Sequence, residues 1–287
     1  MGGGGDAADS RGRSSCILER SSAMAFLKTG DFVQHYRVDG VAGKPALLFA
    51  NSLGSDLRIW DDVTARLAGH YQLICYDLRG HGLSEAPAPP YSAADLAGDV
   101  VAILDRLKIT QAVICGVSVG GLIAQAVALN HPERVRALVL GDTGAKIATA
   151  DAWQQRIDKV RADGVESLVQ MTMERWFSAG FREKCAADIR GYSLMLRQTS
   201  ADGYIGTCAA LRDTDFRSAV RQIRQPTLVL CGAEDIATPP GLGRELAGLI
   251  PGARFSLIEK AAHLPAVEQP DAVSERMMQF LQEVQIV

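Results

Sequence analysis

The sequence predicts an α/β fold, in which a mostly parallel central sheet carries helices on both faces and an inserted helical cap. Strand-like and helix-like stretches alternate over most of the 287 residues, which is typical of a parallel sheet. The alternation stops between Asp142 and Pro226, where helical patterns with scattered aromatic residues take over. We therefore expect a core formed by 24–142 and 221–287, with 143–220 as the cap.

The core strands are predicted from short apolar runs that end at glycine, proline or polar clusters. In chain order they are 46–50, 72–76, 111–115, 136–140, 227–231 and 255–259. The segment 95–107 predicts the helix before the third of these strands. Residues 1–23 are rich in glycine, serine and charge and lack the apolar core of a signal peptide, so we expect a disordered leader or extension before Met24.

The most informative motif is Gly-Val-Ser-Val-Gly-Gly at 116–121, which follows the strand 111–115 directly and precedes an apolar helical stretch. A serine between a strand and a helix sits on a sharp turn that lifts its hydroxyl above the sheet edge, an arrangement called a nucleophile elbow. Gly116 and Gly120 would relieve the crowding beside that turn. The motif predicts Ser118 as the nucleophile of an acyl transfer to water.

A serine nucleophile needs a histidine base and a carboxylate that orients the histidine. Of the five histidines, His263 stands in a short loop after the strand 255–259, which would place it at the same sheet edge as Ser118. Asp235 follows the strand 227–231 in the same way, with Glu234 as the alternative acid. The order Ser118, Asp235, His263 is that of the α/β hydrolases.

Stabilising the oxyanion requires two N–H donors. The N–H of Val119, at the start of the helix after the serine, is the first. The second should come from the loop 51–54, which follows the strand 46–50, and we assign it to Leu53 with Ser52 as the alternative.

Several segments together resemble the 3-oxoadipate enol-lactonases of the α/β-hydrolase fold, and the resemblance runs from about Met24 to the C-terminus. They are Asn-Ser-Leu-Gly at 51–54, Tyr-Asp-Leu-Arg-Gly-His-Gly at 76–82, the elbow at 116–121, Thr-Gly-Ala-Lys-Ile at 143–147, Glu-Arg-Trp-Phe at 174–177 and Cys-Gly-Ala-Glu-Asp at 231–235. The resemblance implies hydrolysis of the enol-lactone of 3-oxoadipate to 3-oxoadipate in the bacterial breakdown of aromatic acids, without a cofactor or a metal.

The cap should determine which substrate is accepted. Arg175 and Lys146 are candidates for binding the carboxylate of a small anionic lactone, and Trp153 and Trp176 for walls around its ring. Ser52 is a further candidate for contact with the substrate. Other hydrolases of this fold remain open, namely a carboxylesterase, a carbon–carbon bond hydrolase or a cofactor-free perhydrolase. A non-catalytic binding protein on the same fold is disfavoured because no triad member is missing.

Composition excludes several classes of partner. The net charge of −3 does not favour nucleic acid, and no apolar run reaches the roughly 18 residues of a membrane span. The six cysteines form no Cys-x-x-Cys pair, which favours free thiols in a reducing compartment and hence a cytoplasmic protein. The sequence leaves the oligomeric state open.

Overall fold

The computed structural model describes residues 23–287; of the leader predicted for 1–23, all but Ala23 lies outside the described residues. Within them, eight strands form one sheet in the order β1-β2-β4-β3-β5-β6-β7-β8. The pairs β1–β2 and β2–β4 are antiparallel and the remaining pairs are parallel, which confirms the mostly parallel sheet. The strands are β1 (Ala23–Thr29), β2 (Phe32–Gly40), β3 (Ala46–Ala50), β4 (Gln72–Tyr76), β5 (Ala112–Val117), β6 (Val135–Gly141), β7 (Thr227–Gly232) and β8 (Arg254–Ile258).

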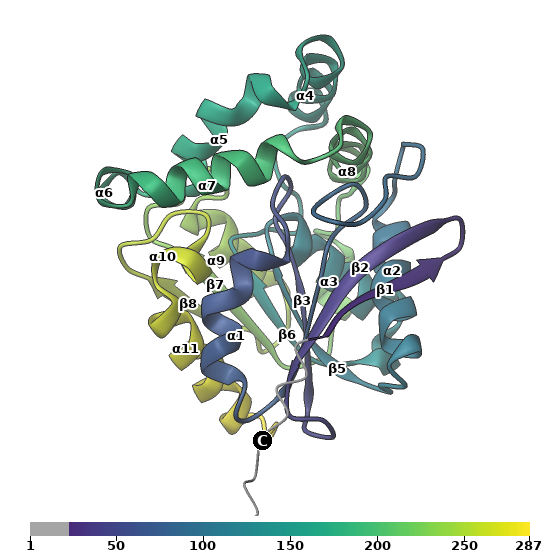
Figure 1. Cartoon of the computed structure of the whole chain (residues 1–287). Helices are drawn as coiled ribbons and strands as arrows, with labels where there is room; N and C mark the ends of the chain where they lie inside the picture. The colour runs from purple at the N-terminus through teal and green to yellow at the C-terminus, as the bar shows by residue number, and fades with distance from the viewer. Residues whose placement is uncertain (1–22) are drawn as a thin grey trace, which may run out of the picture.

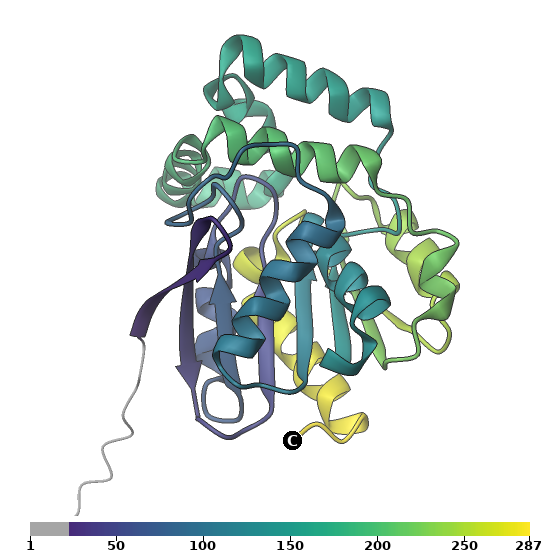
Figure 2. The same cartoon turned by 90° about the vertical axis from the view of Figure 1, so that its right-hand side faces the viewer.

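Helices cover both faces of the sheet (Figures 1 and 2). One face carries α1 (Asp61–Leu67) and α11 (Pro270–Glu283), and the other carries α2 (Ala93–Arg106) and α3 (Val119–Asn130). Every residue of β3 and β5 is buried, as expected for central strands covered on both sides. The other core helices are α9 (Pro240–Leu249), α10 (Pro265–Glu268) and the 3-10 helices η1 (Leu57–Trp60), η2 (Pro132–Arg134) and η4 (Ala219–Gln222).

The segment between β6 and β7 is helical and lies over one end of the sheet (Figure 1). We call its five α-helices the cap helices, and all of them begin and end within 143–220. They are α4 (Ala150–Asp163), α5 (Val169–Trp176), α6 (Ala179–Lys184), α7 (Ala186–Arg197) and α8 (Ala201–Asp213), with η3 (Val165–Leu168) between the first two.

The last cap helix is tied closely to the core. The Ser200 N–H donates a hydrogen bond of 2.8 Å to the Gly80 carbonyl, in the loop that follows β4. A Cβ atom on Gly203 would lie only 2.5 Å from the Gly80 Cα, so glycine at 203 allows α8 to approach the core backbone. This contact fixes one side of the space between the cap helices and the sheet.

Among the helices of residues 23–287, none combines the length and the apolar content needed to cross a lipid bilayer.

Candidate active site

Ser118 lies on a sharp turn between β5 and α3, as the elbow motif predicts. Its backbone has φ 59° and ψ −119°, a conformation that residues with a side chain rarely adopt. A Cβ on Gly116 would stand 2.1 Å from the Gly120 carbonyl oxygen, and one on Gly120 would stand 2.2 Å from the Ala50 carbonyl oxygen. Both glycines are therefore required by the close approach of neighbouring backbone.

His263 and Asp235 form a buried hydrogen-bonded pair. The His263 Nδ1–H donates to Asp235 Oδ2 over 2.9 Å, and Thr238 Oγ donates to the same oxygen over 2.6 Å. Burial by itself would raise the pKa of Asp235, but the charge of His263 and the hydrogen bonds from His263 and Thr238 outweigh it and lower the pKa to about 2. Asp235 is thus ionised, while Glu234, the alternative acid, is exposed.

His263 lines the same pocket as Ser118. His263 Nε2 lies 3.4 Å from Ser52 Oγ, on the loop after β3. Because Nδ1 carries the proton shared with Asp235, Nε2 is the atom free to accept a proton. Three loops that follow β5, β7 and β8 thus bring Ser118, Asp235 and His263 to one end of the sheet.

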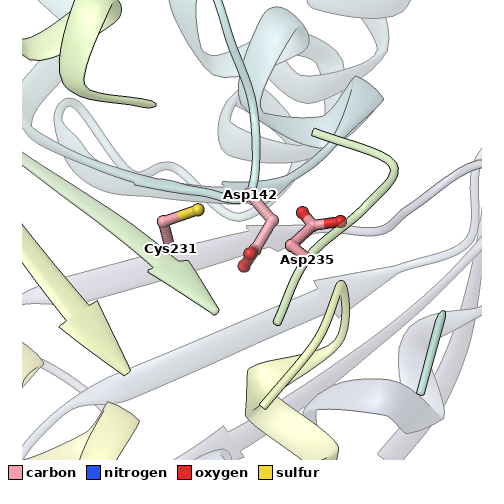
Figure 3. Close-up of side chains that lie close together, drawn as sticks. All are labelled: Asp142, Cys231 and Asp235. Carbon is pink, nitrogen blue, oxygen red and sulfur yellow. The ribbon is translucent and has the colours of Figure 1, made fainter. Parts of the chain in front are cut away.

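Another buried carboxyl group, that of Asp142, lies close to Asp235 and Cys231 (Figure 3). It directly follows β6, is fully buried, and its Oδ1 accepts a hydrogen bond of 2.7 Å from the Gly232 N–H. Ligand-type atoms of Asp142, Cys231 and Asp235 lie within 4.8 Å of one another. Burial raises the pKa of Asp142 well above its usual range, and the charge of Asp235 raises it further. Both effects favour the neutral form of the Asp142 carboxyl group.

This cluster resembles a metal-ligand set in composition, but hydrogen bonds within the protein account for the Asp235 carboxylate. The two oxygens of Asp235 already accept four hydrogen bonds, two of them from the backbone N–H groups of Ala237 and Thr238.

Two backbone N–H groups are candidates for binding an oxyanion, one on Val119, which directly follows Ser118, and one on the pocket residue Leu53. Val119 is the first residue of α3, so its N–H has no acceptor within the helix. Neither Val119 N–H nor Leu53 N–H donates to any group among residues 23–287. Leu53 lines the same pocket as Ser118, on the loop after β3. Both donors stand where the sequence predicts an oxyanion hole.

The pocket itself has a volume of about 110 Å³ and lies between the sheet edge and the cap helices. Its lining combines the polar groups of the core loops with aromatic and basic side chains of the cap helices. The lining residues are Ser52, Leu53, Ser118, Ile147, Ala148, Ala152, Trp153, Arg156, Thr172, Arg175, Trp176, Tyr204, Ala237, Thr238 and His263. The predicted Ser52, Trp153, Arg175 and Trp176 are thus all pocket residues.

Two arginines project into the pocket from the cap helices, Arg156 from α4 and Arg175 from α5. Neither forms an ion pair with an acidic side chain in the described part of the chain. The Arg156 guanidinium lies 5.3 Å from the centre of the Trp153 ring and 3.5 Å from the Tyr204 hydroxyl. Burial lowers the pKa of Arg175, and the like charge of Arg156 lowers it further. Two cations so close together favour an anionic ligand.

Lys146 does not belong to this pocket, contrary to our expectation. Its amino group lies 3.6 Å from the carboxylate of Asp215, and it is absent from the pocket lining formed by residues 23–287. The Asp215 carboxylate is also bound by Arg217 at 2.6 Å. The positive charge of Lys146 is therefore paired with an acidic residue of the protein. Arg156, and not Lys146, is the second basic residue in the pocket lining.

Sequence reasoning missed Arg156 and Thr238. Arg156 stands three residues after Trp153, which places both side chains on one face of α4, and this spacing could have indicated it. Thr238 stands three residues after Asp235, where a hydroxyl can bond back to the carboxylate.

Comparisons with known proteins agree with this geometry. Residues 45–270 match the family model described as alpha/beta hydrolase fold. The chain is 41% identical to 3-oxoadipate enol-lactonase 2 of Acinetobacter baylyi over 86% of this chain and 92% of that protein. The structure of an enol-lactonase from Burkholderia xenovorans superposes with a TM-score of 0.87 at 36% identity, covering 90% of this chain and all of that one. A hydrolase from Pseudomonas aeruginosa gives a TM-score of 0.87 at 37% identity, covering 90% and 98%. The resemblance noted in the sequence is confirmed, and the chain belongs to the α/β-hydrolase family.

Proposed function

We propose that this chain is a serine hydrolase that opens the lactone ring of 3-oxoadipate enol-lactone to give 3-oxoadipate. The observation that carries the proposal is a pocket that contains Ser118, His263 and two arginines, neither of which forms an ion pair with an acidic residue in 23–287. Support for the substrate comes from the two enol-lactonases to which the chain is similar in sequence and structure. The geometry combines the parts of acyl transfer with a site for a small anion.

In the first step, Ser118 Oγ attacks the lactone carbonyl carbon while His263 Nε2 takes the hydroxyl proton. Asp235 holds the imidazole in the required tautomer and stabilises its positive charge. The N–H groups of Val119 and Leu53 bind the oxygen that becomes negative, and each donor is worth about 3 kcal/mol in the barrier. These roles are supported by three observations: Ser118, His263 and Leu53 line one pocket, Asp235 is hydrogen-bonded to His263, and Val119 directly follows Ser118.

Ring opening then breaks the bond between the acyl carbon and the ring oxygen, and the resulting enolate, which stays attached to the acyl group on Ser118, takes up the proton held by His263 to become an enol. An enolate is a better leaving group than a simple alkoxide, so this step depends less on proton donation by His263. A water molecule activated by His263 next hydrolyses the ester on Ser118, and the released enol becomes a ketone. No cofactor is required at any step.

The substrate carboxylate would bind to Arg156 and Arg175. Charged hydrogen bonds to a carboxylate contribute about 1.5–3 kcal/mol each, enough to separate an anionic lactone from a neutral ester. Trp153 and Trp176 would enclose the ring, since both lie in the pocket wall. We place the enzyme in the cytoplasm, supported by the free thiols of Cys75, Cys115, Cys185, Cys208 and Cys231.

Turnover of the enol-lactone by the wild-type protein and by Ser118→Ala tests the proposal. Loss of the nucleophile should lower kcat by on the order of 10⁵-fold or more, with the thermal unfolding midpoint largely kept. A folded Ser118→Ala variant with substantial activity would rule out the mechanism. A wild-type enzyme that hydrolyses neutral esters faster than the enol-lactone would rule out the substrate.

A further inference from the structure

Glu268 is a buried carboxylate that the proposed mechanism does not use. It is the last residue of α10 and its oxygens accept three hydrogen bonds. Oε1 accepts from the Ala262 N–H at 2.7 Å, and Oε2 accepts from the Ser178 N–H at 3.0 Å and from Ser178 Oγ at 2.5 Å. One side chain thus connects two segments that are far apart in the sequence.

Both connected segments border the active site. Ala262 directly precedes His263, and Ser178 follows two residues after Trp176, which lines the pocket from α5. A second link lies on the other side of the histidine, where the Leu264 N–H donates to the Trp176 carbonyl over 3.2 Å. The backbone on both sides of His263 is therefore held by the chain segment that joins α5 to α6.

The chemistry of Glu268 suits a rigid connector. Burial raises the pKa of Glu268, while the hydrogen bonds from Ser178 and Ala262 oppose that change. An ionised carboxylate only accepts hydrogen bonds, and all three groups around it are donors. Such charge-assisted bonds are roughly twice as strong as neutral ones.

We propose that Glu268 is a positioning residue, which links the cap segment at Ser178 to the His263 loop and thereby holds the imidazole at Ser118. The inference rests on the proposed roles of Ser118 and His263. A general base must stay within hydrogen-bond reach of the proton it takes, and a displacement of 1 Å costs about 100-fold in rate. Loosening either end of the connector should therefore slow the reaction of Ser118.

The test measures how fast a fluorophosphonate inactivates the enzyme. Ser118 Oγ forms a bond to phosphorus, the P–F bond breaks, fluoride leaves, and His263 takes the hydroxyl proton. This reaction uses Ser118 and His263 but does not involve the lactone. It therefore tests the role of Glu268 independently of which substrate the enzyme hydrolyses. The variants are Glu268→Gln and Ser178→Ala, the second of which keeps the core side of the connector intact.

Ser193→Ala is the matched control. Ser193 and Ser178 are equally buried, each with 8% of its surface exposed. Ser193 lies in α7, and its hydroxyl donates a hydrogen bond to the Ile189 carbonyl of the same helix. We expect inactivation of Ser178→Ala and Glu268→Gln to be slower by about 10- to 100-fold per folded molecule, and that of Ser193→Ala to be unchanged. The kcat for the lactone should fall by a similar factor with little change in KM.

Folded Ser178→Ala and Glu268→Gln enzymes that react with the fluorophosphonate at the wild-type rate would overturn the proposal. In that case Glu268 would only satisfy buried donors. An equal loss in Ser193→Ala would overturn it as well, because the effect would then come from any cavity in the cap helices.

Discussion

The two sides of the pocket differ in how their polar groups are paired. On the core side, which we call the floor, the oxygens of Asp235 accept four hydrogen bonds and His263 is fixed by one of them. On the cap side, which we call the cap wall, Arg156 and Arg175 have no acidic partner among the described residues. The floor is preorganised for proton transfer, whereas the cap wall leaves its charges for a ligand. In the proposed mechanism, chemistry and substrate choice thus belong to separate parts of the chain.

The largest effect should come from a substitution of Asp235, on the floor of the pocket. Asp235→Asn removes the charge and favours the wrong tautomer of His263, so we expect kcat to fall by about 10³- to 10⁴-fold while KM changes little. Steady-state kinetics with the enol-lactone measure it. Glu234→Gln is the matched control, since that neighbouring carboxylate is exposed, and its kcat should stay near the wild-type value. The reverse pattern would mean that Glu234 is the acid.

A smaller and more selective effect should come from the cap wall. Arg175→Met should lower kcat/KM for the anionic lactone by about 10- to 100-fold, because one charged hydrogen bond is lost. Hydrolysis of a neutral ester such as p-nitrophenyl acetate should change by less than about twofold, since it makes no such bond.

Lys146→Met is the control for that experiment, because it removes a positive charge that is already paired with Asp215. It should leave both substrates close to the wild-type rate. If Arg175→Met slowed both substrates equally, the arginine would support the floor and the separation of the two sides would fail.

The same division explains how much of the site could be predicted. Ser118, Asp235 and His263 each stand in a loop directly after a strand, and the carboxyl ends of parallel strands meet at one edge of the sheet. A local motif therefore indicates where each side chain goes. The six strands from β3 to β8 were predictable for a related reason, since runs such as 46–50 are buried on both faces and are apolar throughout.

The cap wall could be predicted only in part. The spacing from Trp153 places Arg156 on the same face of α4, but whether Arg156 or Lys146 reaches the pocket depends on how α4 packs on α8 and on where Asp215 lies. Glu268 was missed because its partner Ser178 is 90 residues away. Contacts between distant segments leave no periodic signal in the sequence.

The smallest expected effect is on stability. It should depend on pH in opposite ways for Asp142 and Asp235, the two buried carboxyl groups of the floor. The pKa of Asp142 is raised in the folded protein, so its stabilising contribution is complete below the unfolded value near 3.8 and is lost as the pH rises toward the folded pKa. An asparagine at this position cannot ionise, so Asp142→Asn should avoid the loss of stability at higher pH. Its side-chain oxygen can still accept the hydrogen bond from the Gly232 N–H. The variant should therefore gain stability relative to the wild type as the pH rises from 4 to 8, with little change in kcat.

Asp235 should behave in the opposite sense. The pKa of Asp235 is lowered to about 2, so its contribution is present above the unfolded value near 3.8 and is lost as the pH falls toward 2. Asp235→Asn should therefore destabilise the protein at pH 7, where Asp142→Asn stabilises it. Thermal unfolding across this pH range resolves the contrast, since 1 kcal/mol corresponds to about 2–4 °C for a chain of this size. If the advantage of Asp142→Asn did not grow with pH, Asp142 would be ionised, and the floor would hold two adjacent negative charges for one histidine.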